Sequence, residues 1–320
     1  MVPERFPDLI GQPTAIALLS QALDLGRLPP AYLFAGPEGV GRRRAALHLA
    51  DLLLGPPGGP DPAQQRRIRQ GNHPDLLWVE PTYLHQGRLV PLSAAAEQGV
   101  IRKSPPQIRL EQVRQISQFL SRPPLQGERA VVVIEAAETM AEAAANGLLK
   151  TLEEPGQATL VLLAPGPQAL LPTLVSRCQT IPFQRLNPED MARVLNQIGQ
   201  AEILHHGQVI ALAQGSPGQA IAAYGQLQAM PPELLARLQQ RPPNLRQALD
   251  LGRQVAKTLD LEAQLWVLDY LLHWYWQHQP EDATWLFTLE TAKRHLRRFV
   301  TPRLVWEVTL MQAIDPKSIP

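Results

Sequence analysis

The first half of the chain alternates between short apolar runs and longer amphipathic stretches. Five apolar runs, typical of strands buried on both faces of a parallel sheet, occur at 31–35, 75–79, 130–135, 159–164 and 179–183. The stretches between them place apolar residues every three or four positions, which predicts helices over 12–25, 45–54, 108–120, 139–154 and about 168–175. This alternation through residues 1–185 predicts a three-layer α/β domain with a mainly parallel sheet.

Two segments of this half lack either pattern. Residues 55–62, GPPGGPDP, indicate a loop by composition. Residues 80–107 contain four prolines and no clear period, so we expect an extended or partly mobile excursion.

The strand pattern ends after Leu186. Helices are predicted over 187–199, near 205–213 and over 217–229, and then over most of 244–313. Proline pairs bound 231–243 and suggest a boundary near residue 230. We therefore predict an α/β base domain at 1–185, a small helical lid at 186–229 and a separate all-α domain at 230–320.

Composition narrows the class of protein without deciding the function. Hydrophobic residues make up 45% of the 320 residues and charged residues 18%, which is typical of a globular protein. The net charge is +1, so any contact with an anion must be local. Cys178 is the single cysteine, which excludes an internal disulfide and a multi-cysteine zinc site and fits a reducing compartment.

Nothing near the N-terminus resembles a signal peptide, because MVPERFPDLIG is polar and interrupted by two prolines. No apolar run approaches the roughly 18 residues that a membrane helix needs. We expect a cytoplasmic protein with no membrane partner.

The first candidate for chemistry is the stretch GPEGVGRRR at 36–44, between a predicted strand and a predicted helix. Gly36, Gly39 and Gly41 are spaced as in a phosphate-binding loop, but Arg42 and Arg43 stand where such a loop has Lys and then Ser or Thr. An arginine fork does not replace the slender lysine ammonium, and Arg43 offers no oxygen ligand for Mg²⁺. We expect a vestigial loop whose arginines extend into water, with binding of an anion or nucleotide without hydrolysis as the alternative.

Several stretches together resemble one family. They are GNHPDLLWVEP (71–81), AAANGLLKTLEEPGQATLVLLA (143–164), LLPTLVSRCQTIPF (170–183) and ALAQGSPGQA (211–220). Their order and spacing are similar to those of the clamp-loader branch of the AAA+ ATPases, over most of residues 6–225. The resemblance implies an AAA+ base domain, the helical lid, and a C-terminal collar through which the subunits of bacterial DNA polymerase III assemble.

Against that family, the elements of ATP hydrolysis are incomplete. Active members carry Asp-Glu at the end of a buried strand, where this chain has Glu135 and Ala136. Ala164-Pro165 and Gly218 stand where active members have a polar sensing residue and an arginine directed at the γ-phosphate. Glu138 is interpreted as a helix-start residue rather than a base. Together with the altered loop, these positions predict a subunit that does not hydrolyse ATP.

The SRC element, Ser176, Arg177 and Cys178, is intact. The resemblance implies that Arg177 projects towards the nucleotide of a neighbouring subunit and acts as an arginine finger in trans. The alternative is a salt bridge inside its own domain. Cys178 is interpreted as a small buried hydrophobic residue rather than a reactive thiol.

Other motifs carry weaker signals. Residues 51–75 lack the four-cysteine zinc module of many relatives and contain only His73, in a turn before a strand, so no zinc is expected. The basic clusters at 66–69 and 293–298 are interpreted as solvated or intersubunit surfaces, with a DNA contact as the alternative. Trp266, Tyr270 and Trp274 recur every four residues, which favours a helical core or collar interface over a base-stacking platform.

The function implied is that of a non-catalytic subunit of the DNA polymerase III holoenzyme. Its expected partners are ATPase subunits of the gamma/tau type, a clamp-opening delta subunit and, through the complex, the sliding clamp and primed DNA. Two alternatives remain at this point. One is an ATP-hydrolysing AAA+ subunit of a repair or recombination complex, and the other is a free-standing scaffold.

Overall fold

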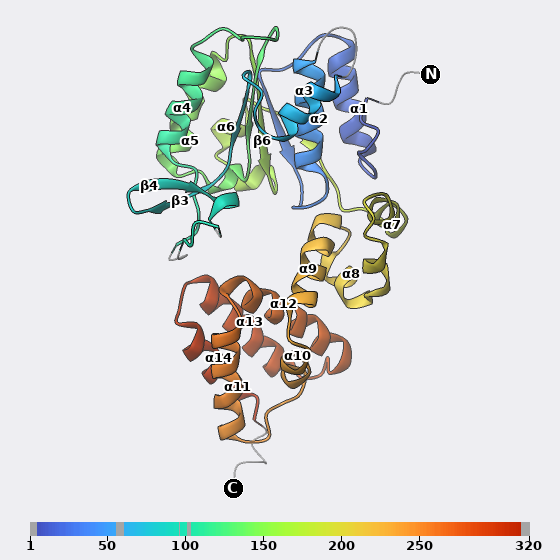
Figure 1. The fold of residues 1–320 in the computed structure, drawn as a ribbon, viewed down its shortest axis with the longest axis vertical. Helices are drawn as coiled ribbons and strands as arrows, with labels where there is room; N and C mark the ends of the chain where they lie inside the picture. The colour runs from blue at the N-terminus through green and yellow to red at the C-terminus, as the bar shows by residue number, and fades with distance from the viewer. Residues whose placement is uncertain (1–4, 56–60, 96, 101–103, 315–320) are drawn as a thin grey trace. The chain divides into compact units, whose positions relative to one another are not determined.

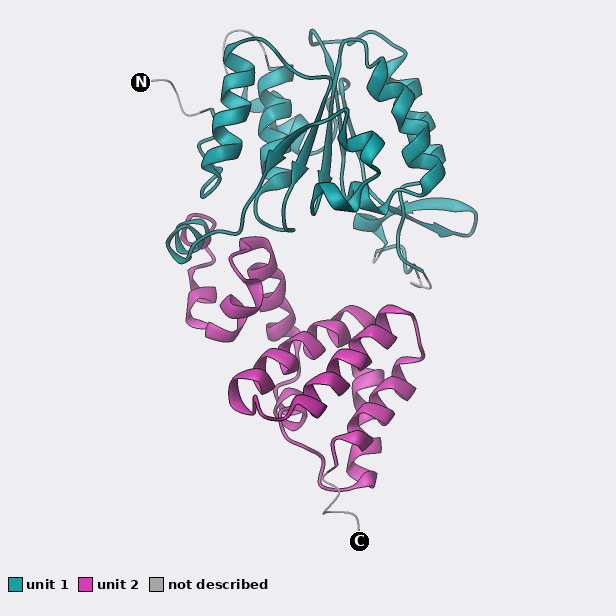
Figure 2. Ribbon diagram, turned by 180° about the vertical axis from the view of Figure 1, so that it is seen from behind, with its two compact units in different colours: residues 1–194 teal, residues 195–320 magenta. Residues whose placement is uncertain are grey.

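The computed structural model describes residues 5–55, 61–95, 97–100 and 104–314, which form two compact units at residues 1–194 and 195–320 (Figure 2). The predicted loop at 55–62 falls largely outside the described residues. The finer division into three domains, with boundaries after residues 185 and 229, stays a prediction.

The N-terminal unit is built on a five-stranded sheet whose neighbours all pair in parallel, in the order β2-β5-β6-β1-β7. The strands are β1 (Ala31–Ala35), β2 (Leu76–Val79), β5 (Ala130–Ile134), β6 (Ala158–Ala164) and β7 (Gln179–Pro182). All residues of β1, β5 and β6 are buried. Continuous apolar runs therefore predicted the central strands because both faces of this sheet are covered.

Helices cover the two faces of the sheet (Figure 1). One side carries α1 (Pro13–Asp24), α2 (Arg42–Leu54) and α3 (Pro62–Arg69), and the other carries α4 (Leu110–Leu120) and α5 (Glu142–Glu153). On the latter side Ile116 of α4 and Leu148 of α5 are fully buried against alternate residues of the strands. Short helical segments complete the unit: η2 (Ala137–Thr139), η3 (Pro167–Ala169) and α6 (Pro172–Val175). The predicted three-layer arrangement is confirmed.

The segment after β2 differs from the prediction. Residues 82–91 form an antiparallel hairpin of β3 (Thr82–His85) and β4 (Arg88–Pro91), followed by η1 (Leu92–Ala94). Tyr83 and Val90 lie opposite each other and are buried, which anchors one face of the hairpin. This part of 80–107 is therefore extended, as expected, but it pairs into a regular hairpin that the sequence did not predict, while residues 96 and 101–103 lie outside the described residues.

The described part of the C-terminal unit is entirely helical. Its elements after α7 (Pro188–Gln197), which spans the boundary, are η4 (Ala201–His205), α8 (Gly207–Ala213), α9 (Pro217–Ala229), α10 (Pro232–Leu238), α11 (Leu245–Thr258), α12 (Leu261–His278), α13 (Ala283–Arg297) and α14 (Pro302–Gln312). Four of these helices begin at a residue whose side chain accepts a hydrogen bond from the amide three residues on: Ser216, Asn244, Asp260 and Asp282.

The core of this unit is formed by side chains from all five helices α10, α11, α12, α13 and α14. Tyr270 is 7% exposed, and Trp266 and Trp274 pack against the same core from partly buried positions. The helical-core interpretation of this aromatic set is thus confirmed. Helices α11 and α14 approach closely at Gly252, where an added Cβ would lie 2.9 Å from the backbone nitrogen of Glu307.

Candidate functional site

The loop between β1 and α2 is held by backbone contacts. Gly36 donates its N–H to the carbonyl of Ala164 at 3.1 Å, and a Cβ on Gly36 would lie 2.3 Å from the carbonyl oxygen of Phe183. Gly39 and Gly41 have φ values of 75° and 111°, in the region that favours glycine. These glycines are therefore required by the fold of the loop itself, with or without a phosphate. Helix α2 begins at Arg42, three residues before the predicted start. The prediction began too late because the three arginines do not belong to the apolar pattern on which it relied.

A buried glutamine braces this loop from behind, and the sequence pattern did not reveal it. Gln12 is 2% exposed and donates from Nε2 to the carbonyls of Val40 and Gln184, at 3.2 and 2.7 Å. Its Oε1 accepts the N–H of Gln184 at 2.9 Å. Because all three bonds are internal, the loop is tied to the segment that follows β7.

Two residues predicted to depart from a working ATP site, Arg43 and Glu135, form an ion pair with each other. Arg43, in the Ser or Thr position of the loop, donates from Nη1 to both carboxylate oxygens of Glu135, at 2.9 and 3.3 Å. The Arg43 guanidinium also lies 4.8 Å from the ring centroid of Trp78, whose Nε1 donates to Glu135 at 2.8 Å. The three residues come from α2, β2 and the end of β5. Trp78 carried no signal in the sequence for this role.

Arg42 stands in the lysine position of the loop and is half-buried. Burial lowers the pKa of its guanidinium, while Glu138, Glu38 and Glu135 act in the opposite direction. Its Nη1 is buried and has no hydrogen-bond partner among the described residues. Arg42 is therefore positioned by packing and by nearby carboxylates, rather than extending into water as predicted for a vestigial loop.

The other three predicted departures lie on separate elements. Ala136 follows Glu135 in a left-handed conformation, with φ 49° and ψ 52°, and begins the η2 turn, in which Glu138 lies as predicted. Ala164 ends β6, and its carbonyl accepts the Gly36 amide. Gly218 lies in the first turn of α9, in the C-terminal unit. None of these positions supplies a carboxylate or a cation.

Arg177 follows α6 and lies at the surface. Its Nη2 donates to Oε1 of Glu153 at 2.6 Å, and its Nη1 donates to the carbonyl of Thr173 at 3.0 Å and weakly to Oγ of Ser176 at 3.5 Å. The side chains of Arg177 and Glu153 are 35% and 52% exposed. Arg177 thus has a carboxylate partner in its own unit, but at the surface rather than in the interior. Glu153 was not singled out from the sequence.

The parallel sheet separates these two groups of residues. The loop and Glu135 follow the carboxyl ends of β1 and β5, whereas Glu153 and Arg177 precede the amino ends of β6 and β7. The seven residues of β6 separate the two edges by roughly 20 Å. Arg177 therefore cannot reach the loop of its own chain.

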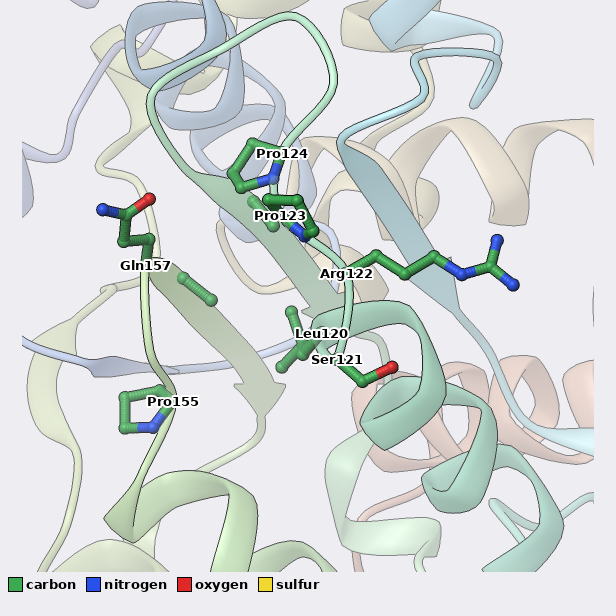
Figure 3. A pocket seen from close by; sticks show the side chains of 9 residues that line it. Leu120, Ser121, Arg122, Pro123, Pro124, Pro155 and Gln157 are labelled. Atoms are coloured by element: carbon green, nitrogen blue, oxygen red, sulfur yellow. The ribbon is translucent and has the colours of Figure 1, made fainter.

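A small cavity of about 160 Å³ also lies at the amino edge (Figure 3). It is lined by the end of α4, the Pro123-Pro124 turn and the start of β6, and the side chain of Arg122 points away from it. Cofactor pockets typically measure about 300–1,000 Å³, so this one is too small for a nucleotide. Within the described ranges, no three His, Cys, Asp or Glu side chains gather as metal ligands.

The remaining residues singled out from the sequence are Cys178 and the two basic clusters. Cys178 packs against the core, and burial raises its pKa to about 11, so it is a hydrophobic residue rather than a reactive thiol, as predicted. Lys293 forms an ion pair with Asp269 across α13 and α12. The basic residues of α3, Arg66, Arg67 and Arg69, lie in its last turn. No described helix is long and apolar enough to cross a membrane.

Comparison with known proteins identifies the family. Residues 11–187 match the family model described as DNA polymerase III, delta subunit, and residues 189–313 match that of the cyanobacterial DNA polymerase III delta prime, C-terminal domain. The chain belongs to the delta-prime family of DNA polymerase III subunits. The resemblance inferred from the sequence motifs is thereby confirmed.

Individual delta-prime relatives agree with this assignment. The chain is 37% identical to DNA polymerase III subunit delta′ of Bacillus subtilis over 183 residues, covering 56% of this chain and 49% of that protein. It is 34% identical to subunit delta′ of Pseudomonas aeruginosa over 220 residues, covering 66% and 60%. The chain thus spans about half to three-fifths of the length of these relatives.

The chain is also similar to DNA polymerase III subunits with other names. Subunit gamma/tau of Mycobacterium tuberculosis is 30% identical over 236 residues, covering 71% of this chain and 38% of that protein. Among solved structures, a gamma subunit-related protein of Thermotoga maritima aligns over 94% of this chain and 98% of that chain, with a TM-score of 0.57 and 18% identity. This likeness supports the predicted AAA+ fold with a helical C-terminal region.

Proposed function

We propose that this delta-prime family member is a non-hydrolysing subunit of the DNA polymerase III clamp loader, and that it completes the ATP site of a neighbouring subunit with Arg177. The observation that carries the proposal is the Arg43–Glu135 ion pair. A working site needs a hydroxyl and a carboxylate around Mg²⁺, and here a guanidinium occupies the hydroxyl position and binds the carboxylate.

The second part of the proposal concerns what Arg177 does. Negative charge grows on the phosphoryl oxygens during ATP hydrolysis, and a guanidinium held by another subunit stabilises it. In GTPases such an arginine is worth about 10³- to 10⁵-fold in rate. The location of Arg177 at the amino edge, away from the loop of its own chain, supports action on a neighbour rather than on itself.

The proposed partners follow from the names of the relatives. Subunits named gamma/tau and tau are 30% identical to this chain over 71% and 64% of its length. An ATPase subunit of that type is therefore the proposed neighbour. A clamp-opening delta subunit, the sliding clamp and primed DNA complete the proposed assembly. An ATP-hydrolysing role in repair or recombination is not favoured, because both matching family models describe DNA polymerase III subunits.

The test is to assemble the full chain with the candidate ATPase and delta subunits, and to measure ATP turnover with the sliding clamp and primed DNA. Arg177→Ala should assemble normally but lower turnover by an order of magnitude or more. Arg193→Ala, which removes another exposed arginine paired with a carboxylate, should leave turnover unchanged. Unchanged turnover with Arg177→Ala would reject the finger, and failure of the wild-type chain to join the complex would favour a free-standing scaffold.

A further inference from the structure

The surface contact between α5 and the segment before β7 assigns a role to a second residue. We propose that Glu153 is a positioning residue for Arg177, and that its carboxylate holds the guanidinium in the orientation in which it meets a neighbouring subunit's nucleotide. This inference rests on the proposed function of Arg177 and adds the residue that directs it.

The first argument is the way in which the guanidinium is held. Nη2 of Arg177 bonds Glu153 on α5, while Nη1 bonds the carbonyl of Thr173 on α6. The two contacts approach the planar fork from separate elements, so they fix its direction and not only its distance. A flexible arginine that is already ordered loses less conformational entropy when it meets a phosphate.

The second argument is that these contacts leave donors available. A guanidinium has five N–H groups. The bonds to Glu153, Thr173 and Ser176 start from Nη1 and Nη2 and use at most three of these hydrogens. Arg177 can therefore keep Glu153 and still offer two donors to phosphoryl oxygens.

The third argument is that Glu153 stands where a helix disfavours a carboxylate. It is the last residue of α5, Glu154 is the C-cap, and Lys150 is the only basic residue in the last turn. Negative side chains at a helix C-terminus oppose the macrodipole. A compensating contact offsets such a local conflict, and for Glu153 that contact is Arg177. Glu154 shares the unfavourable position, but no described contact joins it to Arg177.

The matched pair Glu153→Gln and Glu154→Gln tests the assignment in the assembled clamp loader. Both remove one charge from the same end of α5, but only the first breaks the ion pair. Glu153→Gln should lower the kcat of the neighbouring ATPase roughly three- to tenfold, because Arg177 loses its orientation. The KM for ATP should be unchanged, because the neighbour's nucleotide site is not altered. Glu154→Gln should match the wild type, and Glu153→Asp should recover part of the loss. Equal turnover in Glu153→Gln and Glu154→Gln would overturn the inference, as would a higher kcat in Glu153→Gln.

Two further measurements separate this inference from the proposed function. Adding Glu153→Gln to Arg177→Ala should cause no further loss, since the carboxylate acts only through the arginine. In the isolated full chain, the Nε–H resonance of Arg177 should show restricted rotation that Glu153→Gln relaxes and Glu154→Gln does not. If Arg177→Ala leaves turnover unchanged, the proposed function fails. If Arg177→Ala lowers it and Glu153→Gln does not, only the positioning role fails.

Discussion

At the scale of single residues, several charged side chains of the N-terminal unit bind partners from the chain itself. Glu135 meets Arg43 and Trp78, and Arg177 meets Glu153. Asp75 is the most buried of these carboxylates, at 2% exposed, and accepts the backbone amides of Leu125, Gln126 and Gly127 at 2.6, 2.8 and 2.9 Å. It joins the start of β2 to the loop between α4 and β5.

Asp75→Asn should lower the free energy of unfolding by roughly 2 kcal/mol near neutral pH. Asparagine keeps one acceptor oxygen, while the amides of the loop bond both carboxylate oxygens. Burial acts to raise the pKa of Asp75, but the three amide bonds and His73 outweigh it, so the pKa lies below its ordinary value of 3.8. A depressed folded pKa means that the stabilisation is present above the unfolded pKa and is lost as pH falls through the folded one.

Urea unfolding across the acid range checks both statements. The difference in free energy of unfolding between the wild type and Asp75→Asn should be constant at neutral pH and should decrease below about pH 3.8. Asp260→Asn is the control, since Asp260 caps α12 and asparagine caps helices as well as aspartate. A gap that is the same at every pH would show that the charge of Asp75 contributes nothing.

At the scale of elements, close approach decides where a small residue is required. Gly252→Ala should destabilise the C-terminal unit by about 1–3 kcal/mol, because its Cβ would press on the backbone of Glu307 and Trp306 in α14. Helix propensity alone predicts the opposite sign, a gain of up to about 1 kcal/mol. Thermal or denaturant unfolding of the full chain measures which effect dominates.

Gly225→Ala supplies the comparison for that experiment. Gly225 lies within α9, and a Cβ there would meet no atom within 4 Å, so propensity should act unopposed and stability should rise. If both alanine variants raised stability, the close packing of α11 on α14 would not be limiting.

The same scale shows what the sequence could and could not predict. Strands β1, β5 and β6 were located to within one residue, because strands buried on both faces form nearly continuous apolar runs. The β3–β4 hairpin was missed because its turn is Gln86-Gly87, both with positive φ, and glutamine is not a residue that marks such turns. The prolines at either end of the hairpin and after it, at 81, 91, 105 and 106, also made a strand prediction unfavourable.

The candidate site was predictable only in part, for a related reason. The loop glycines, Glu135 and Arg177 are visible as local motifs. The contacts that define their chemistry are not, since Arg43 and Glu135 are 92 positions apart and Arg177 and Glu153 are 24 apart. Only the pairing of strands in three dimensions brings these partners together, and no periodicity in one sequence reports it.

At the scale of the whole molecule, the positions predicted to depart from an active ATPase occur in both units, so restoring one of them should not restore activity. Arg42→Lys with Arg43→Thr should free Glu135 and permit Mg²⁺-dependent ATP binding by the isolated chain, because a lysine and a hydroxyl return to the loop. Turnover should stay at background, since Ala136, Ala164 and Gly218 still supply no polar group.

Titration with a fluorescent ATP analogue and a phosphate-release assay measure the two properties separately. Arg44→Lys, outside the lysine and hydroxyl positions of the loop, is the control and should change neither. ATP turnover by the double variant above that of the wild type would show that Glu135 suffices once the loop is restored, and would contradict the expectation that Ala136, Ala164 and Gly218 prevent turnover.

The two edges of the parallel sheet also have a consequence for how such a chain can change over generations. The central strands between them are buried, and the described hydrogen bonds of Arg177 go to Glu153, Thr173 and Ser176 and not to the loop. Mutations that erode the carboxyl edge therefore send no penalty to the amino edge, provided that packing is kept. Under the proposed function, an ATPase of this architecture can become a non-hydrolysing subunit by losing the residues of the carboxyl edge alone. Selection for the neighbouring subunit's ATPase activity would then preserve Arg177.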